Sequence, residues 1–199
     1  MSRQQFWLPA GFTLILLGYF MVWLPGRVAG LSFIGLEMGE WVKFLPQVRN
    51  GEILPGRNLF YLPPITLAML MSLTTVCWLP GRWQNWAMRG LAMLVSLLAF
   101  PSLDAIRYEP PAEWLLRLLL IGLAGLVALG SRWLRPGRVW LALWLAIGLT
   151  GAILPTWVYG AIRPVASNLF GYPIGFGPGL WLNLIGHLLL VTLTLKMKN

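Results

Sequence analysis

The chain has 199 residues, of which 58% are hydrophobic and 11% are charged, and its formal net charge at pH 7 is +9. A mean hydropathy of +0.72 excludes an ordinary soluble domain, because such a chain cannot bury its apolar side chains around one core in water. A single cysteine, Cys77, excludes an intrachain disulfide framework and a cysteine-based zinc cluster.

Six apolar segments follow one another along the chain, each close to the ~20 residues that cross ~30 Å of hydrocarbon. We expect transmembrane helices at residues 7–24, 60–79, 84–100, 114–130, 139–155 and 180–195. Tryptophans gather near the expected ends, as indoles at the headgroup level do. Prolines lie at the same boundaries, and Pro155 is expected to close the fifth segment. The predicted fold class is an all-α integral membrane protein, with residues 1–199 forming a single domain of six transmembrane helices.

Basic residues are divided unequally between the connections. One side carries eight basic residues and no acid: Arg3, Arg82, Arg89, Arg132, Arg135, Arg138, Lys196 and Lys198. The other side carries seven basic residues and all six acids, so its formal charge is only +1. Because Lys and Arg stay in the cytoplasm, we expect a multi-pass protein of the cell membrane with cytoplasmic N- and C-termini. Since topology explains the positive charge, the lipid bilayer is an expected partner and nucleic acid is not.

The first connection on the less basic side contains GLEMGEWVKFLPQVRNG. Its apolar residues recur at helical spacing, and Glu37, Glu40 and Lys43 form the opposite stripe. This pattern predicts a short amphipathic helix at the membrane interface. Such a helix either forms a lid or docking surface, with Glu37 and Glu40 as candidate site residues, or only covers the ends of the transmembrane helices.

The second connection on that side, PSLDAIRYEPPAEW, brings three carboxylates near one arginine. Converging carboxylates could act as acid and base or attract a cation, so Asp104, Arg107 and Glu109 are candidate site residues. In the structural interpretation, Asp104 pairs with Arg107, and Glu113 pairs with Arg117 at a spacing of four residues.

Two features mark the end of the chain. Four glycines and two prolines in SNLFGYPIGFGPG predict a non-helical loop at residues 171–179, either re-entrant or ordinary. In the last segment, Asn183 and His187 lie one turn apart on one helix face. Polar groups at membrane depth point at a cavity or a partner helix, so this pair either binds a solute or bridges two helices. A single histidine cannot complete a closed metal site, and no metal is expected.

Small residues on the fourth and fifth segments predict close helix packing within the bundle, or a surface for another membrane protein. They include Gly122, Gly125 and Gly130 on the fourth segment, and Gly148 and Gly151 on the fifth.

The chain lacks a nucleotide-binding glycine loop, a G-x-S-x-G elbow and an H-E-x-x-H zinc motif, which favours a non-catalytic protein. We expect a small integral subunit or scaffold of a larger membrane complex, partnered by other membrane subunits or a second copy. The alternative is a small-solute transport component with an outward-facing pocket. Six helices, cytoplasmic termini and large outer loops resemble the substrate-binding subunits of energy-coupling-factor vitamin transporters, although no motif of that family occurs. A third hypothesis is an intramembrane enzyme that uses the outer carboxylates or His187.

Overall fold

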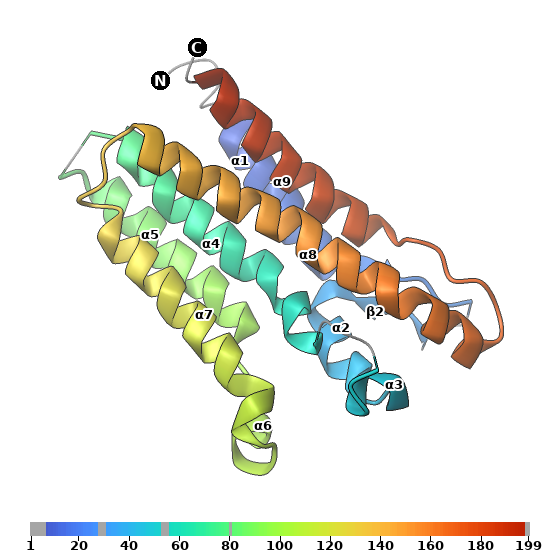
Figure 1. The fold of residues 1–199 in the computed structure, drawn as a ribbon. Helices are drawn as coiled ribbons and strands as arrows, with labels where there is room; N and C mark the ends of the chain where they lie inside the picture. The colour runs from blue at the N-terminus through green and yellow to red at the C-terminus, as the bar shows by residue number, and fades with distance from the viewer. Residues whose placement is uncertain (1–6, 28–30, 53–55, 80, 198–199) are drawn as a thin grey trace.

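The computed structural model describes residues 7–27, 31–52, 56–79 and 81–197, and nearly all its regular structure is helical (Figure 1). Four helical segments are long and apolar enough to cross a membrane. They are Arg57–Cys77, Pro111–Gly130, Arg138–Phe170 and Pro178–Lys196. By length and composition, the chain is therefore an all-α protein suited to a membrane.

Nine α-helices, three short 3-10 helices and two short strands occur in the described residues. In chain order they are α1 (Leu8–Phe20), β1 (Val22–Leu24), β2 (Phe33–Ile34), α2 (Gly35–Val42), α3 (Pro46–Arg49), η3 (Arg57–Tyr61), α4 (Leu62–Thr74), η4 (Thr75–Cys77), α5 (Trp83–Ser96), η5 (Leu97–Ala99), α6 (Leu103–Tyr108), α7 (Pro111–Gly130), α8 (Arg138–Phe170) and α9 (Pro178–Met197). The two strands pair antiparallel, with Val22 opposite Ile34.

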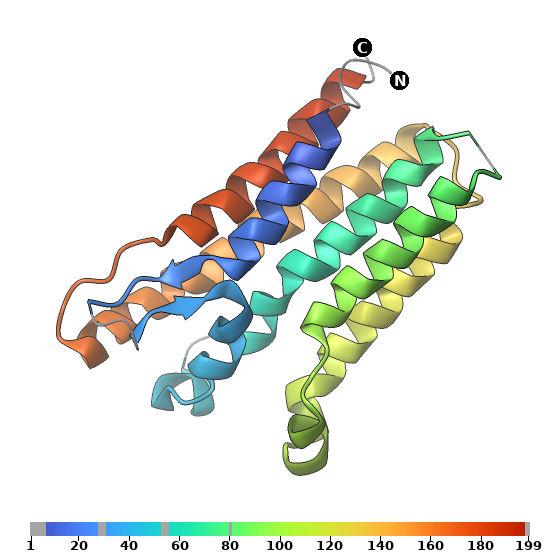
Figure 2. The same ribbon diagram turned by 180° about the vertical axis from the view of Figure 1, so that it is seen from behind.

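Six helices form the bundle: α1, α4, α5, α7, α8 and α9 (Figures 1 and 2). Helix α4 lies at its centre, and every residue of α4 is buried. One end of the bundle holds the start of α1, the end of α9 and the α4–α5 and α7–α8 connections (Figure 1). We call this end the basic end, since Arg82, Arg89, Arg132, Arg135, Arg138 and Lys196 lie there. The opposite end holds α2, α3, α6 and the α8–α9 connection (Figure 1).

The first and third expected segments form shorter helices than a full span requires. Helix α1 has 13 residues and α5 has 14. Such helices are about 20 Å long, whereas the hydrocarbon layer is about 30 Å thick. Both nevertheless run beside longer helices in the bundle (Figure 2).

The expectation that Pro155 closes the fifth segment is wrong. Helix α8 continues for 33 residues, with Pro155 and Pro164 inside it, and ends at Gly171, whose φ of +72° suits glycine. Its length of about 50 Å exceeds the hydrocarbon thickness. The loop that follows therefore covers only residues 171–177. It lies against β1, where the Gly177 N–H donates to the Trp23 carbonyl over 2.8 Å.

Close helix approach occurs on α8 as expected, because a Cβ at Gly148 would lie 2.7 Å from Val191. On α7 the prediction is confirmed only in part. Ala124 and Ala128 are buried, and a Cβ at Gly125 would lie 3.6 Å from Met93, but Gly122 and Gly130 have nothing within 4 Å of such an atom. Gly122 is exposed. The tightest helix pair is instead α1 with α9, where a Cβ at Gly18 would lie 2.6 Å from the Asn183 backbone nitrogen.

Candidate functional site

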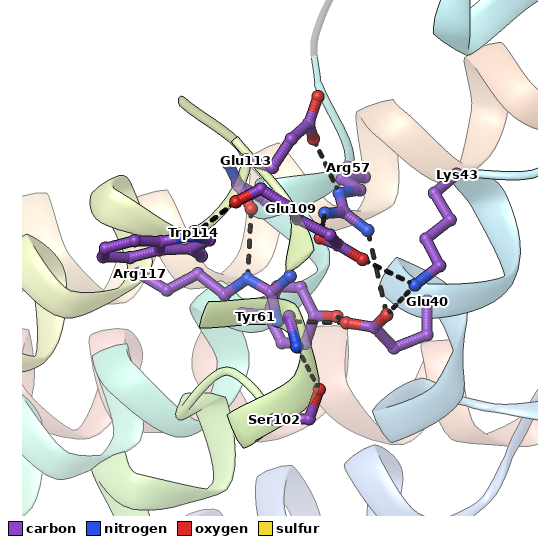
Figure 3. Close-up of polar contacts among 11 residues, drawn as sticks. Glu40, Lys43, Arg57, Tyr61, Ser102, Glu109, Glu113, Trp114 and Arg117 are labelled. Carbon is purple, nitrogen blue, oxygen red and sulfur yellow. Dashed lines mark hydrogen bonds and ion pairs between the residues drawn. The ribbon is translucent and has the colours of Figure 1, made fainter. Parts of the chain in front are cut away.

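Charged side chains from three distant segments converge at the end of the bundle opposite the basic end (Figure 3). They come from α2, from η3, and from the α6–α7 connection with the first turns of α7. We call the following seven residues the polar network: Glu40, Lys43, Arg57, Tyr61, Glu109, Glu113 and Arg117.

The expected amphipathic helix is present as α2, and it positions the first two members. Met38 and Val42 are fully buried beneath it, while Glu40 and Lys43 are only partly buried. Glycine at position 39 lets Tyr61 reach the helix, because a Cβ there would lie 2.5 Å from the tyrosine ring. The amphipathic pattern of α2 and the glycine at position 39 thus place the Glu40 carboxylate against η3.

The Glu40 carboxylate is at the centre of the polar network. One oxygen accepts hydrogen bonds from the Tyr61 hydroxyl (2.6 Å) and Arg117 Nη1 (3.1 Å), and the other accepts from Lys43 Nζ (2.8 Å). Burial raises the pKa of Glu40, but the Lys43 and Tyr61 hydrogen bonds and the Arg117 charge outweigh burial and lower that pKa to about 2. Glu40 is therefore ionised at neutral pH.

Arg57 joins all three carboxylates of the polar network although only 4% of its side chain is exposed. Its Nε donates to Glu113 over 3.0 Å, and its Nη2 donates to Glu109. The Glu40 carboxylate lies 3.7 Å from Nη1, which has no hydrogen-bond partner among the described residues. A guanidinium this buried requires opposite charges around it.

Arg117 lies within the second turn of α7, and 1% of its side chain is exposed. Besides the bond to Glu40, its Nε donates to Asn58 Oδ1 over 3.2 Å, and its guanidinium lies 4.0 Å from the centre of the Tyr61 ring. This placement combines an ion pair with a cation–π contact. Arg117 therefore connects the apolar helix α7 to both α2 and η3.

Lys43 and Glu109 close the polar network on its exposed side, with Nζ and Oε1 2.9 Å apart. The hydrogen bond to Glu109 raises the pKa of Lys43, and the same bond lowers the pKa of Glu109. The network thus contains three cations and three anions. The lowered pKa values of Glu40 and Glu109 and the raised pKa of Lys43 keep these three groups charged at neutral pH, which suits a structural clamp better than proton transfer.

A cavity of about 580 Å³ lies beside the polar network. Lys43, Arg57 and Glu109 line it, together with Arg49 on α3. Its volume is in the range of small-molecule pockets, and both polar and apolar side chains surround it.

The structure brings together two of the five outer residues predicted from the sequence. Glu40 and Glu109 belong to the polar network. Glu37 instead accepts a hydrogen bond from the Ile34 backbone N–H (3.1 Å), Asp104 is exposed in the first turn of α6, and Arg107 lies over the Tyr108 ring. Those three residues do not converge with the others.

The expected local ion pairs are also wrong. Asp104 forms no ion pair with Arg107 in the described part of the chain, and Glu113 and Arg117 form none with each other. Glu113 pairs with Arg57, whose position is 56 residues earlier in the sequence, and Arg117 pairs with Glu40. Tertiary ion pairs with buried arginines replace the helical i, i+4 pair.

Five members of the polar network were not predicted as site residues: Lys43, Arg57, Tyr61, Glu113 and Arg117. One signal in the sequence points to Arg117, since an arginine one turn inside an apolar helix requires a partner. The partner's identity depends on how α2 folds back over the bundle. No local pattern specifies it.

Asn183 and His187 are fully buried and are hydrogen-bonded within the bundle. His187 Nε2 lies 2.9 Å from the Thr66 hydroxyl of α4, and Nδ1 lies 2.9 Å from the Asn183 carbonyl. The Asn183 amide donates to the Gly151 carbonyl of α8 over 3.2 Å. These contacts join α9 to α4 and α8. Neither residue lines the cavity beside the polar network.

No group of three or more His, Cys, Asp or Glu side chains among the residues with described positions could hold a metal ion. Comparison with known proteins adds no relative: no protein-family model, curated protein or solved structure matches the chain.

Proposed function

We propose that the chain is a non-catalytic, multi-pass protein of the cell membrane that serves as a small integral subunit or scaffold of a larger membrane complex. The pairing of its buried polar side chains with one another supports this role. Both buried arginines of the polar network face carboxylates, and His187 and Asn183 bond to neighbouring helices. A solute path through the bundle would require these groups to be available.

In this proposal all six bundle helices cross the bilayer, and the shorter α1 and α5 cross with the help of flanking residues and local thinning of the bilayer. The basic end faces the cytoplasm, because lysine and arginine are retained there. Large apolar side chains on the bundle surface support burial in lipid or against a partner. Examples are Leu94 at 65% exposed, Leu119 at 61% and Leu126 at 67%.

Helix α7 offers the surface best suited to a partner helix. Gly122 lies among its exposed leucines, and a Cβ added there would meet nothing within 4 Å, so a neighbouring backbone could approach it closely. The partner that fills this notch is another subunit of the complex or a second copy of the chain. The open space beside Gly122 therefore supports assembly through α7.

Gentle extraction from the native membrane followed by native mass spectrometry tests the proposal. We expect reproducible co-purifying subunits or a homo-oligomer with the unaltered chain, and their loss with Gly122→Leu. Gly90→Leu is the matched control, because Gly90 on α5 is also exposed and has nothing within 4 Å. A monomer without any partner, or equal partner loss in both variants, would contradict assembly through α7.

A small-solute transport component is the second candidate, and the 580 Å³ cavity favours it. In that case the cavity would open to the outer side and bind a solute through Lys43, Arg49 and the neighbouring carboxylates. The same mass spectra would then show a monomer that carries a bound small molecule. Arg49→Ala would release the molecule, because Arg49 lines the cavity without belonging to the polar network.

A further inference from the structure

A second cavity, of about 410 Å³, lies at the basic end between η4, α5 and the α7–α8 connection. Three arginines, Arg89, Arg132 and Arg135, are among the residues that line it. Acidic residues are absent from its described lining, and the sequence places no acid in either adjoining connection. The cavity therefore has an uncompensated positive charge, unlike the polar network.

Arg89 is held in place by hydroxyl groups and not by carboxylates. Its Nε donates to Ser131 Oγ over 3.1 Å, and its Nη2 donates to Thr75 Oγ1 over 3.0 Å. Both hydroxyl-bearing residues are buried. A guanidinium has five N–H donors in a rigid fork, so these two bonds fix its orientation and leave donors for a ligand.

Two further features of the cavity suit a phosphate ester. Arg132 and Arg89 line the same cavity, so an anion bound between them would relieve the repulsion of their like charges. Asn85 is 6% exposed and lines the cavity, and its Oδ1 is buried without a hydrogen-bond partner among the described residues. This acceptor cannot bind an anion, but it can accept from a hydroxyl or ammonium group attached to one.

We propose that this cavity binds a phosphate ester, with Arg89 and Arg132 on the phosphate oxygens and Asn85 on a hydroxyl or ammonium donor of the same ligand. One guanidinium group can donate two parallel N–H···O bonds to two oxygens of a phosphate. This donor set is therefore more selective for phosphate than for a simple halide. The headgroup of an anionic phospholipid and a soluble phosphate ester share this chemistry. Basic pockets between membrane helices commonly hold lipid headgroups.

Native mass spectrometry of the full chain in detergent tests the site, with dioleoyl phosphatidylglycerol and glycerol 3-phosphate as probes. We expect Arg89→Gln to weaken phosphatidylglycerol binding at least tenfold. Arg132 is exposed, and its side chain contacts the Trp133 ring but forms no hydrogen bond with the described residues. Arg132→Gln should weaken phosphatidylglycerol binding about threefold, which corresponds to the loss of one exposed charge contact. Arg138→Gln is the matched control, because Arg138 is exposed at the same end but does not line the cavity.

The outcomes separate the two sources of phosphate. Retention of phosphatidylglycerol in the presence of millimolar glycerol 3-phosphate would identify a lipid site, and its displacement would identify a soluble ligand. If Arg89→Gln and Arg132→Gln bind each probe as tightly as the unaltered chain does, the proposal is overturned. A loss as large in Arg138→Gln would also overturn it, because the attraction would then be a general property of the basic end.

Discussion

Replacing Glu40 by glutamine perturbs the centre of the polar network with little change in volume. The variant keeps an acceptor for the Tyr61 hydroxyl but removes the charge that faces Arg117 and Lys43. The amide oxygen can still accept from Arg117 Nη1, and Asn58 also remains a hydrogen-bond partner, but the negative charge beside this buried arginine is gone. A buried guanidinium would therefore lose its only carboxylate among the described residues.

The magnitude follows from burial on the two sides of the pair. Removing one partner of a fully buried ion pair costs about 3–5 kcal/mol. Because the Glu40 side chain is 39% exposed, water screens part of the pair, and we expect a loss of about 2 kcal/mol. For a domain of this size, that loss corresponds to a decrease in Tm of about 4–8 °C.

Thermal unfolding in a mild detergent, followed by far-ultraviolet circular dichroism, measures this loss. Glu37→Gln is the matched control, because Glu37 is a carboxylate of the same helix that, among the residues with described positions, accepts a hydrogen bond only from the Ile34 N–H. We expect its Tm to change by less than about 1 °C. Equal Tm values for Glu40→Gln and Glu37→Gln would show that the Glu40 charge does not stabilise the buried Arg117.

Three further predictions concern pH, packing and the intramembrane hydrogen bonds. The pKa of Glu40 is lowered to about 2 from 4.5. The Glu40 carboxylate therefore contributes its full stabilisation above pH 4.5 and loses it as the pH falls towards 2. Over that interval the Tm of Glu40→Gln should decrease less than the Tm of the unaltered chain. Gly18→Ala should destabilise the fold by about 1–3 kcal/mol, because its Cβ would meet the α9 backbone, whereas Gly90→Ala should leave stability unchanged or raise it by up to about 1 kcal/mol in the same unfolding assay. Thr66→Val should lower the free energy of unfolding by about 1–3 kcal/mol, because His187 Nε2 loses its partner, whereas Thr66→Ser should retain most of that stability. Equal stabilities of the two variants would show that the hydroxyl is not needed.

The sequence predicted the helical class and the local features that follow from composition and periodicity. Alternation at helical spacing located α2, and the isolated polar pair Asn183 and His187 does lie buried between helices. The end of α8 was mispredicted because proline disfavours a helix only by a few kcal/mol, and tertiary contacts can offset that cost. Pro155 is buried inside this helix.

The polar network could be predicted only in part, for a different reason. Glu40 and Glu109 stood out as carboxylates in the connections that hold all six acidic residues. Their partners depend on contacts between residues far apart in the sequence, such as Arg57 with Glu109, which are 52 positions apart. Local spacing instead favoured Glu113 with Arg117. Periodicity identifies helix faces, but it does not specify which helices meet.

The central claim is that the basic end of the bundle faces the cytoplasm and the polar network faces the outside. Single cysteines at Asn50 and Gly137, each in a Cys77→Ser background, test it directly, because both positions are exposed and lie at opposite ends of the bundle. A membrane-impermeant thiol reagent applied to intact cells should label Asn50→Cys and should label Gly137→Cys only after the cells are opened. Labelling of Gly137→Cys but not Asn50→Cys in intact cells would contradict the account.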